Sequence, residues 1–241
     1  MDIILVPGLW LDASSWDDVV PVLEDAGHRA RPMTLPGVGE SAERSAGIGM
    51  ADWVDAVITQ IDAASEPVVL VGHSGGGNVV WSAASERADR VARVVFVDTV
   101  PPPPRSAIGE FDLVDGVIPF PGWGHFPDED VFDLDTATRA RALAQTRTIP
   151  ARVPTDPVPL SGARHRVPVT MLMGASDRAQ TEAAISGWEP YADEFRAIDD
   201  VVIAKIGSGH WPQFSQPRRL GALINESVAH SQSAVDGDDR A

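Results

Sequence analysis

The chain has 241 residues, of which 44% are hydrophobic and 22% are charged. These values are typical of one large globular domain with a sizeable core, so we expect a single domain. Acidic residues outnumber basic ones by 35 to 19, which gives a net charge of −16 at pH 7. Because such a surface repels phosphate backbones and anionic lipids, we expect neither a nucleic acid nor a membrane as a partner.

The chain contains no cysteine, which excludes disulfides, thiolate metal sites and a cysteine nucleophile. Its first residues, MDIILVPG, lack a basic segment, and their apolar run is too short for a signal peptide. No apolar run approaches the roughly 20 residues that span a bilayer. These features predict a cytoplasmic protein.

The first hundred residues alternate between strand and helix patterns. We expect strands at 3–6, 28–35, 68–71 and 91–98, and helices at 19–26, 50–64 and 78–87. The strands at 68–71 and 91–98 show no polar alternation, which indicates burial on both faces. This pattern predicts a mostly parallel sheet covered by helices on both sides.

The alternation breaks between residues 101 and 166. This stretch opens with four prolines and looks helical only at 128–148, so we interpret it as an insertion with its own role. The alternation then resumes with a strand at 167–174, a helix at 179–196, a strand at 201–207 and a helix at 217–230. The polar segment 231–241 is expected to be a disordered tail.

One short motif carries the chemistry. Gly72-His73-Ser74-Gly75-Gly76 has the spacing G-x-S-x-G and lies between a predicted strand and a predicted helix. In that context a sharp turn lifts the serine hydroxyl off the sheet, and glycines on either side avoid a collision. Ser74 is therefore the predicted nucleophile, with the N–H of Gly75 available to a developing negative charge. The GxGxxG and Walker spacings are absent, which argues against a nucleotide cofactor.

A serine nucleophile needs a base, and the base needs a carboxylate to orient it. His210 is the predicted base, because it lies in the loop after the last strand and follows the serine in the chain. Asp177 and Asp98 both follow strands and are the two candidates for the acid. We favour Asp177 on the chain order, in which the acid follows the serine and precedes the histidine.

A second oxyanion donor is expected from the loop after the first strand. In PGLWLDASSW, the N–H of Leu9 is the preferred candidate and that of Trp10 is the alternative.

These segments resemble the α/β-hydrolase superfamily over residues 1–230. The resemblance is carried by LVPGLWLDASSWDDVVPVLEDAGHRA, VVLVGHSGGG, TMLMGASDR and GSGHWPQFSQP. It is strongest to the small-lid group that includes plant methylesterases, hydroxynitrile lyases and bacterial esterase-like proteins. Members of that group usually carry His-Gly after the first strand, whereas this chain has Pro7-Gly8.

The resemblance implies the α/β-hydrolase fold, with a core of 1–100 and 167–230 and a small helical lid at about 101–166. Phe111, Ile118, Phe120, Trp123 and Phe126 give the lid an apolar patch. Trp10, Trp123 and Phe126 are the expected substrate contacts. The lid aromatics have an equally good alternative role, which is to seat the lid on the core.

The sequence therefore predicts a serine hydrolase that cleaves a carboxylic ester, or a related acyl bond, of a small apolar substrate. Neither a metal nor an organic cofactor is expected. Two alternatives stay open: a cofactor-free enzyme such as a hydroxynitrile lyase on the same fold, and a ligand-binding protein with an unused triad. The sequence does not decide the oligomeric state, and a homodimer is among the open alternatives.

Overall fold

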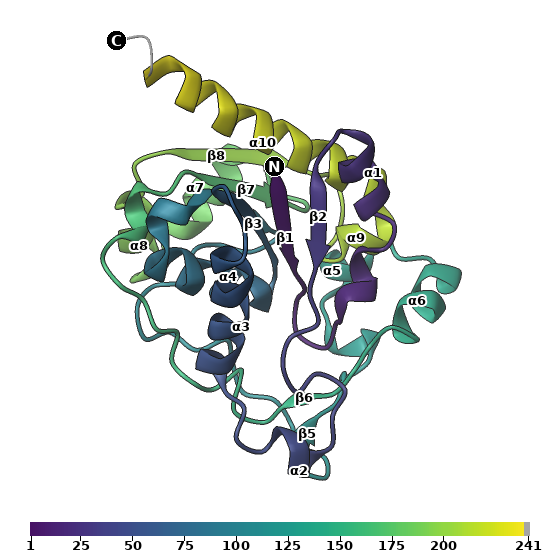
Figure 1. Cartoon of the computed structure of the whole chain (residues 1–241). Helices are drawn as coiled ribbons and strands as arrows, with labels where there is room; N and C mark the ends of the chain where they lie inside the picture. Colours follow the sequence, from purple (N-terminus) through teal and green to yellow (C-terminus); the bar gives the residue numbers. More distant parts are fainter. Residues whose placement is uncertain (239–241) are drawn as a thin grey trace.

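The structure is a computed structural model that describes residues 1–238, with side chains described through residue 230. Its centre is a six-stranded sheet in which all neighbouring strands are parallel (Figure 1). From edge to edge the strands are β2 (Arg29–Pro32), β1 (Asp2–Val6), β3 (Val68–His73), β4 (Val91–Val97), β7 (Val169–Met173) and β8 (Val201–Lys205). This confirms the predicted parallel α/β architecture.

Both faces of the sheet are buried, as the unbroken apolar strands predict. In β3, Val68 and Leu70 pack into the hydrophobic cluster that contains Trp53 of α3 (Met50–Asp62) and Val80 of α4 (Gly75–Glu86). Val69 and Val71 point to the other face, where the cluster includes side chains of α1 (Val20–Asp25) and α10 (Pro217–Asp238). The alternation of side chains along β3 therefore fills two separate cores.

Outside the insertion, the helices differ from the sequence expectation in two places. The expected helix at 179–196 is two helices, α7 (Arg178–Ser186) and α8 (Tyr191–Arg196), because Gly187 ends the first and Pro190 precedes the second. The last helix runs to Asp238, so residues 231–238 continue it where we expected a tail, and 239–241 lie outside the described residues. Through residue 238, no helix is both long enough and apolar enough to cross a membrane.

The insertion at 101–166 leaves the sheet after β4 and returns to it before β7, and it lies at the carboxyl ends of the strands (Figure 1). The expected helix at 128–148 is two short helices, because Asp135 caps a new start by accepting a hydrogen bond from Thr138 N. The helices and strands of the insertion are β5 (Val117–Ile118), α5 (Asp128–Val131), α6 (Thr136–Leu143) and β6 (Ile149–Pro150). β5 and β6 pair in antiparallel fashion, and the short helix α2 (Ala42–Ser45) lies next to them at the bottom of Figure 1.

Backbone crowding explains the glycines that flank the turn from β3 into α4. A Cβ atom on Gly72 would lie 2.7 Å from the carbonyl oxygen of Gly76, and a Cβ on Gly76 would lie 2.5 Å from that of Pro7. Both obstacles are backbone atoms and cannot rotate away. The turn thus requires glycine at both positions for steric reasons alone.

We expect Gly76→Ala to lower the free energy of unfolding by about 1–3 kcal/mol, because the added methyl forces β1 and α4 apart. Gly47→Ala is the matched control, since a Cβ there meets no atom within 4 Å. Urea unfolding followed by circular dichroism measures both. Equal stability of the two variants would contradict the steric argument.

Candidate active site

Ser74 joins the end of β3 to the start of α4 at the carboxyl edge of the sheet. Its backbone angles are φ 49° and ψ −123°, a conformation that non-glycine residues rarely adopt. The N–H of Ser74 donates to the carbonyl of Val97 at 3.1 Å, which fixes the turn against β4. The turn leaves the Ser74 side chain partly exposed, and Gly75 begins α4, so its N–H belongs to the helix N-terminus.

His210 lies between β8 and α9 (Pro212–Ser215), in the loop where the sequence predicted it. Its Nδ1 is 2.7 Å from Oδ2 of Asp98, the residue that follows β4. The other oxygen of Asp98 accepts a hydrogen bond from the N–H of Gly174 at 2.7 Å. Both side chains of the pair are mostly buried, with 18% of His210 and 19% of Asp98 exposed.

The surroundings of Asp98 keep it ionised. Burial by itself raises the pKa of this carboxyl, but the hydrogen bond and charge of His210, together with the Gly174 N–H, lower the pKa overall. An ionised carboxylate can only accept, so Nδ1 of His210 carries the proton. Nε2 is then the nitrogen of His210 that is left to act as a base.

The preference for Asp177 as the partner of His210 is wrong. Asp177 is exposed and caps α7: its carboxylate accepts from Gln180 N at 2.9 Å, and the Gln180 side chain accepts from Asp177 N at 3.0 Å. This reciprocal pair is a capping box, and its D-x-x-Q signature is visible in the sequence. The acid bound to the histidine is Asp98, the alternative that the sequence had kept open.

His73, the residue before Ser74, contacts both the loop of His210 and the loop after β1. It is fully buried, and its Nε2 lies 2.8 Å from the carbonyl oxygen of His210. A carbonyl only accepts, so Nε2 carries the proton and Nδ1 accepts from Gln213 Nε2 at 3.2 Å. Gly8 lies against the same ring, because a Cβ there would be 2.7 Å from Nδ1. Burial and the nearby His210 lower the pKa of His73 to about 3, so the ring is neutral at working pH.

The loop after β1 packs directly on the turn at Ser74. A Cβ on Gly8 would lie 3.1 Å from Ser74 Cβ, and a Cβ on Gly75 would lie 2.9 Å from Leu9 Cγ. Trp10 follows in a left-handed conformation, with φ 65°, and is buried. The loop that carries the two predicted oxyanion candidates therefore borders the candidate nucleophile.

The lid aromatics form a cluster behind His210. The ring centroids of Trp123 and Phe126 lie 5.4 and 5.2 Å from that of Trp211, the neighbour of His210 in the chain. The indole N–H of Trp123 donates to the carbonyl of Arg139 within the lid. This packing fits the expectation that these side chains seat the lid on the core.

Two cavities adjoin these loops. One of about 280 Å³ contains Ser74, and its wall is formed by Gly75, Asn78, Thr99, Val100, Ala107, Ile108, Trp188 and Tyr191. The other, of about 710 Å³, is lined by Trp10 together with Phe111, Ile118 and further lid residues. Neither Trp123 nor Phe126 is among the described residues that line these two cavities. Sequence reasoning missed Trp188 and Tyr191, since they lie outside the lid and follow no motif.

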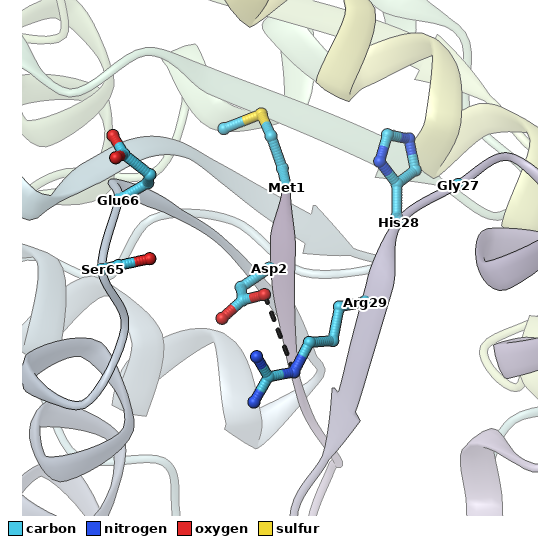
Figure 2. A pocket seen from close by; sticks show the side chains of 7 residues that line it. All are labelled: Met1, Asp2, Gly27, His28, Arg29, Ser65 and Glu66. Atoms are coloured by element: carbon cyan, nitrogen blue, oxygen red, sulfur yellow. Dashed lines mark ion pairs between the residues drawn. The ribbon is translucent and has the colours of Figure 1, made fainter.

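A third cavity, of about 300 Å³, lies at the opposite ends of the strands, where β1 and β2 begin (Figure 2). Its lining includes Asp2, His28 and Arg29, with the Asp2–Arg29 ion pair drawn in the figure. It holds none of the site residues described above. Among the described residues, no cluster of three or more His, Asp or Glu side chains could hold a metal ion.

We expect the low pKa of His73 to make stability fall with acidity. The folded pKa of about 3 lies below the unfolded value of 6.5, so this group stabilises the fold above pH 6.5 and progressively less as the pH falls toward 3. Between pH 7 and pH 5 it contributes a loss of about 2 kcal/mol in the free energy of unfolding.

His73→Gln is the matching variant, because its amide can still donate to the His210 carbonyl and does not titrate. Urea unfolding at pH 7 and pH 5 should show that the free energy of unfolding falls less in the variant than in the wild type. His28, whose pKa is lowered by burial and by the N-terminal amine, titrates alike in both proteins. An identical loss in the two proteins would show that His73 is not the group responsible.

Comparison with known proteins places this geometry in a family. A model of the alpha/beta hydrolase family matches residues 3–223. Esterase PIR7B of Oryza sativa subsp. japonica is 37% identical over 103 residues, which is 41% of this chain and 38% of that protein. A carbendazim hydrolyzing esterase of a Nocardioides species is 33% identical over 101 residues, or 41% of this chain and 42% of that protein. The matches thus span about two fifths of the length of these relatives.

Solved structures show the same fold over nearly the whole chain. An extracellular alpha/beta-hydrolase from a Paenibacillus species superposes with a TM-score of 0.73 at 18% identity, covering 94% of this chain and 98% of that one. A pyrethroid hydrolase, PytH, gives a TM-score of 0.67 at 21% identity, with 95% and 97% covered. At such identities the likeness establishes the fold alone. Because the family model covers most of the sequence, the chain belongs to the alpha/beta hydrolase family.

Proposed function

We propose that this protein is a serine hydrolase that cleaves a carboxylic ester, or a related acyl bond, of a small apolar substrate. The observation that carries the proposal is the 2.7 Å hydrogen bond between His210 Nδ1 and Asp98, at the sheet edge where the strained Ser74 also lies. The relatives with the names of esterases support the same reaction class.

In the proposed reaction, His210 Nε2 accepts the proton of Ser74 as the hydroxyl oxygen attacks the substrate carbonyl. The imidazolium that forms is stabilised by Asp98, which also holds the ring in the required tautomer. His210 then protonates the leaving alcohol, and the acyl group stays on Ser74. A water molecule, deprotonated by the same histidine, releases the acid and restores the serine.

The oxyanion is proposed to bind the N–H groups of Gly75 and Leu9. Two features support this assignment: Gly75 is the first residue of α4, and the loop with Leu9 packs against it. A helix N-terminus stabilises negative charge, and removal of one oxyanion donor typically costs about 10²–10³ in rate. Trp10 stays the alternative donor, although its position in the larger cavity also suits it to contact substrate.

The proposed preference for an apolar substrate comes from the walls of the two cavities. Val100 and Ile108 face the cavity with Ser74, while Trp10, Phe111 and Ile118 face the larger one. Ligand sites are commonly lined in this way, with few polar groups to orient the reacting centre. Trp123 and Phe126 would then act on substrate only indirectly, through the placement of the lid.

We expect Ser74→Ala to abolish hydrolysis of nitrophenyl esters, with a loss of roughly 10⁶-fold in kcat, as found when a triad serine is removed. A panel of esters with rising acyl chain length, assayed in parallel on the wild type and the variant, measures this. The length profile of the wild type would also report the size of the acyl site.

Failure of the wild type to hydrolyse any ester, with both proteins folded by circular dichroism, would contradict the hydrolase proposal. The lyase and ligand-binding alternatives would then move ahead. Equal hydrolysis by both proteins would instead show that Ser74 is not the nucleophile.

The identity of the acid gives a separate prediction. Asp98→Asn should lower kcat by about 10⁴-fold, since the amide favours the wrong tautomer of His210. Asp177→Asn should leave kcat unchanged, because asparagine caps a helix about as well as aspartate. Steady-state kinetics on one nitrophenyl ester compares them. A larger fall in kcat for Asp177→Asn than for Asp98→Asn would reverse our assignment.

A further inference from the structure

Trp188 is an exposed tryptophan at the cavity that contains Ser74. Half of its surface, 52%, is open to solvent, although large apolar side chains of this kind are usually covered. It lines the cavity together with Tyr191; Trp188 lies on the segment between α7 and α8, and Tyr191 is the first residue of α8. Part of an aromatic side chain is therefore left uncovered on the wall of the cavity that contains Ser74.

The two rings of this wall are stacked. The ring centroids of Trp188 and Tyr191 are 3.7 Å apart, with an angle of 18° between the planes. Tyr191 is half-buried, and its pKa is raised by burial, which a hydrogen bond with Ser106 of the lid partly offsets. The pair therefore presents a flat, oriented aromatic surface rather than a loose side chain.

A buried ion pair holds this surface in place. Glu194, in the same helix as Tyr191, receives two hydrogen bonds of 2.6 Å from Arg164 and one of 2.8 Å from the indole N–H of Trp81 in α4. Both charged side chains are nearly inaccessible, with 5% of Arg164 and 3% of Glu194 exposed. Since Trp81 belongs to the helix that begins beside Ser74, α8 is fixed relative to the nucleophile.

The cavity is small. Its volume of about 280 Å³ lies just below the usual range for ligand pockets, roughly 300–1,000 Å³. Val100 and Ile108 supply further apolar wall, while Asn78 and Thr99 supply polar groups. Such a space suits one ring next to a carbonyl better than a long flexible chain.

We propose that Trp188 and Tyr191 form an aromatic subsite that selects esters carrying a planar six-membered aromatic ring close to the scissile carbonyl. The reactive part of this inference rests on the proposed function, whereas the binding of the ring does not. Aromatic pairs gain stability beyond that of burial alone, so a planar ring binds better than a saturated ring of the same skeleton.

The test uses two matched substrate pairs: phenyl acetate with cyclohexyl acetate, and methyl benzoate with methyl cyclohexanecarboxylate. The wild type should favour the aromatic member of at least one pair in kcat/KM, and the pair whose preference depends on Trp188 tells which side of the ester enters the subsite. Trp188→Ala should reduce that preference about three- to tenfold. Trp188→Phe, which keeps an aromatic face, should retain most of it.

Phe132→Ala is the matched control, because Phe132 is similarly exposed, at 62%, but does not line the cavity with Ser74. It should leave the preference unchanged. If Trp188→Ala lowers kcat/KM equally for aromatic and saturated esters, or does not lower it at all, the proposal is overturned.

Calorimetric binding of the same four compounds to Ser74→Ala, with and without Trp188→Ala, separates the subsite from the reaction. Tighter binding of the aromatic compounds that depends on Trp188 would support the subsite even if the wild type hydrolysed nothing, and only the proposed function would then fail. If the wild type hydrolyses esters but neither kcat/KM nor the binding affinity favours the aromatic compounds, the subsite is overturned and the proposed function stands.

Discussion

The hydrogen bond between Asp98 Oδ2 and His210 Nδ1 joins residues 112 positions apart in the chain. It exists because β4 and β7 are neighbours in a parallel sheet and the loop after β8 folds back over their ends. Gly174, at the end of β7, makes this approach possible: a Cβ there would lie 2.7 Å from the carbonyl oxygen of Gly209. The tautomer and the ring orientation of the candidate base depend on this contact.

Backbone strain is concentrated at the same edge. Trp10, Ser74 and Asp98 follow β1, β3 and β4, three adjacent strands, and each has a positive φ, of 65°, 49° and 46°. Such conformations persist only where the surrounding structure enforces them, and they are enriched at functional sites. Here the enforcement is visible as hydrogen bonds between strand ends: Ser74 N to Val97 O at 3.1 Å, and Asp98 N to Leu172 O at 2.8 Å. The sheet thus holds Ser74 and Asp98 in these conformations at the ends of neighbouring strands.

The sequence predicts much of this arrangement, because local patterns encode it. The apolar strands, the G-x-S-x-G turn and the loop of His210 each have a signature within a few residues. The acid has none: β4 and β7 end side by side, so Asp98 and Asp177 are equivalent in strand position, and only the capping pair of Asp177 with Gln180 tells them apart. Trp188 and Tyr191 could not be found at all, since their place beside Ser74 depends on the packing of α8, which no local pattern specifies.

His210 and its neighbour Trp211 both contact the lid. The N–H of His210 donates to the carbonyl of Asp130 in α5 at 2.8 Å, and the next residue, Trp211, packs in the aromatic cluster with Trp123 and Phe126. On its other side, His73 holds the carbonyl of His210 at 2.8 Å. The backbone of the histidine is therefore held between the rigid core and the lid. The contact that orients the ring, the hydrogen bond of Nδ1 to Asp98, is made to the core and not to the lid.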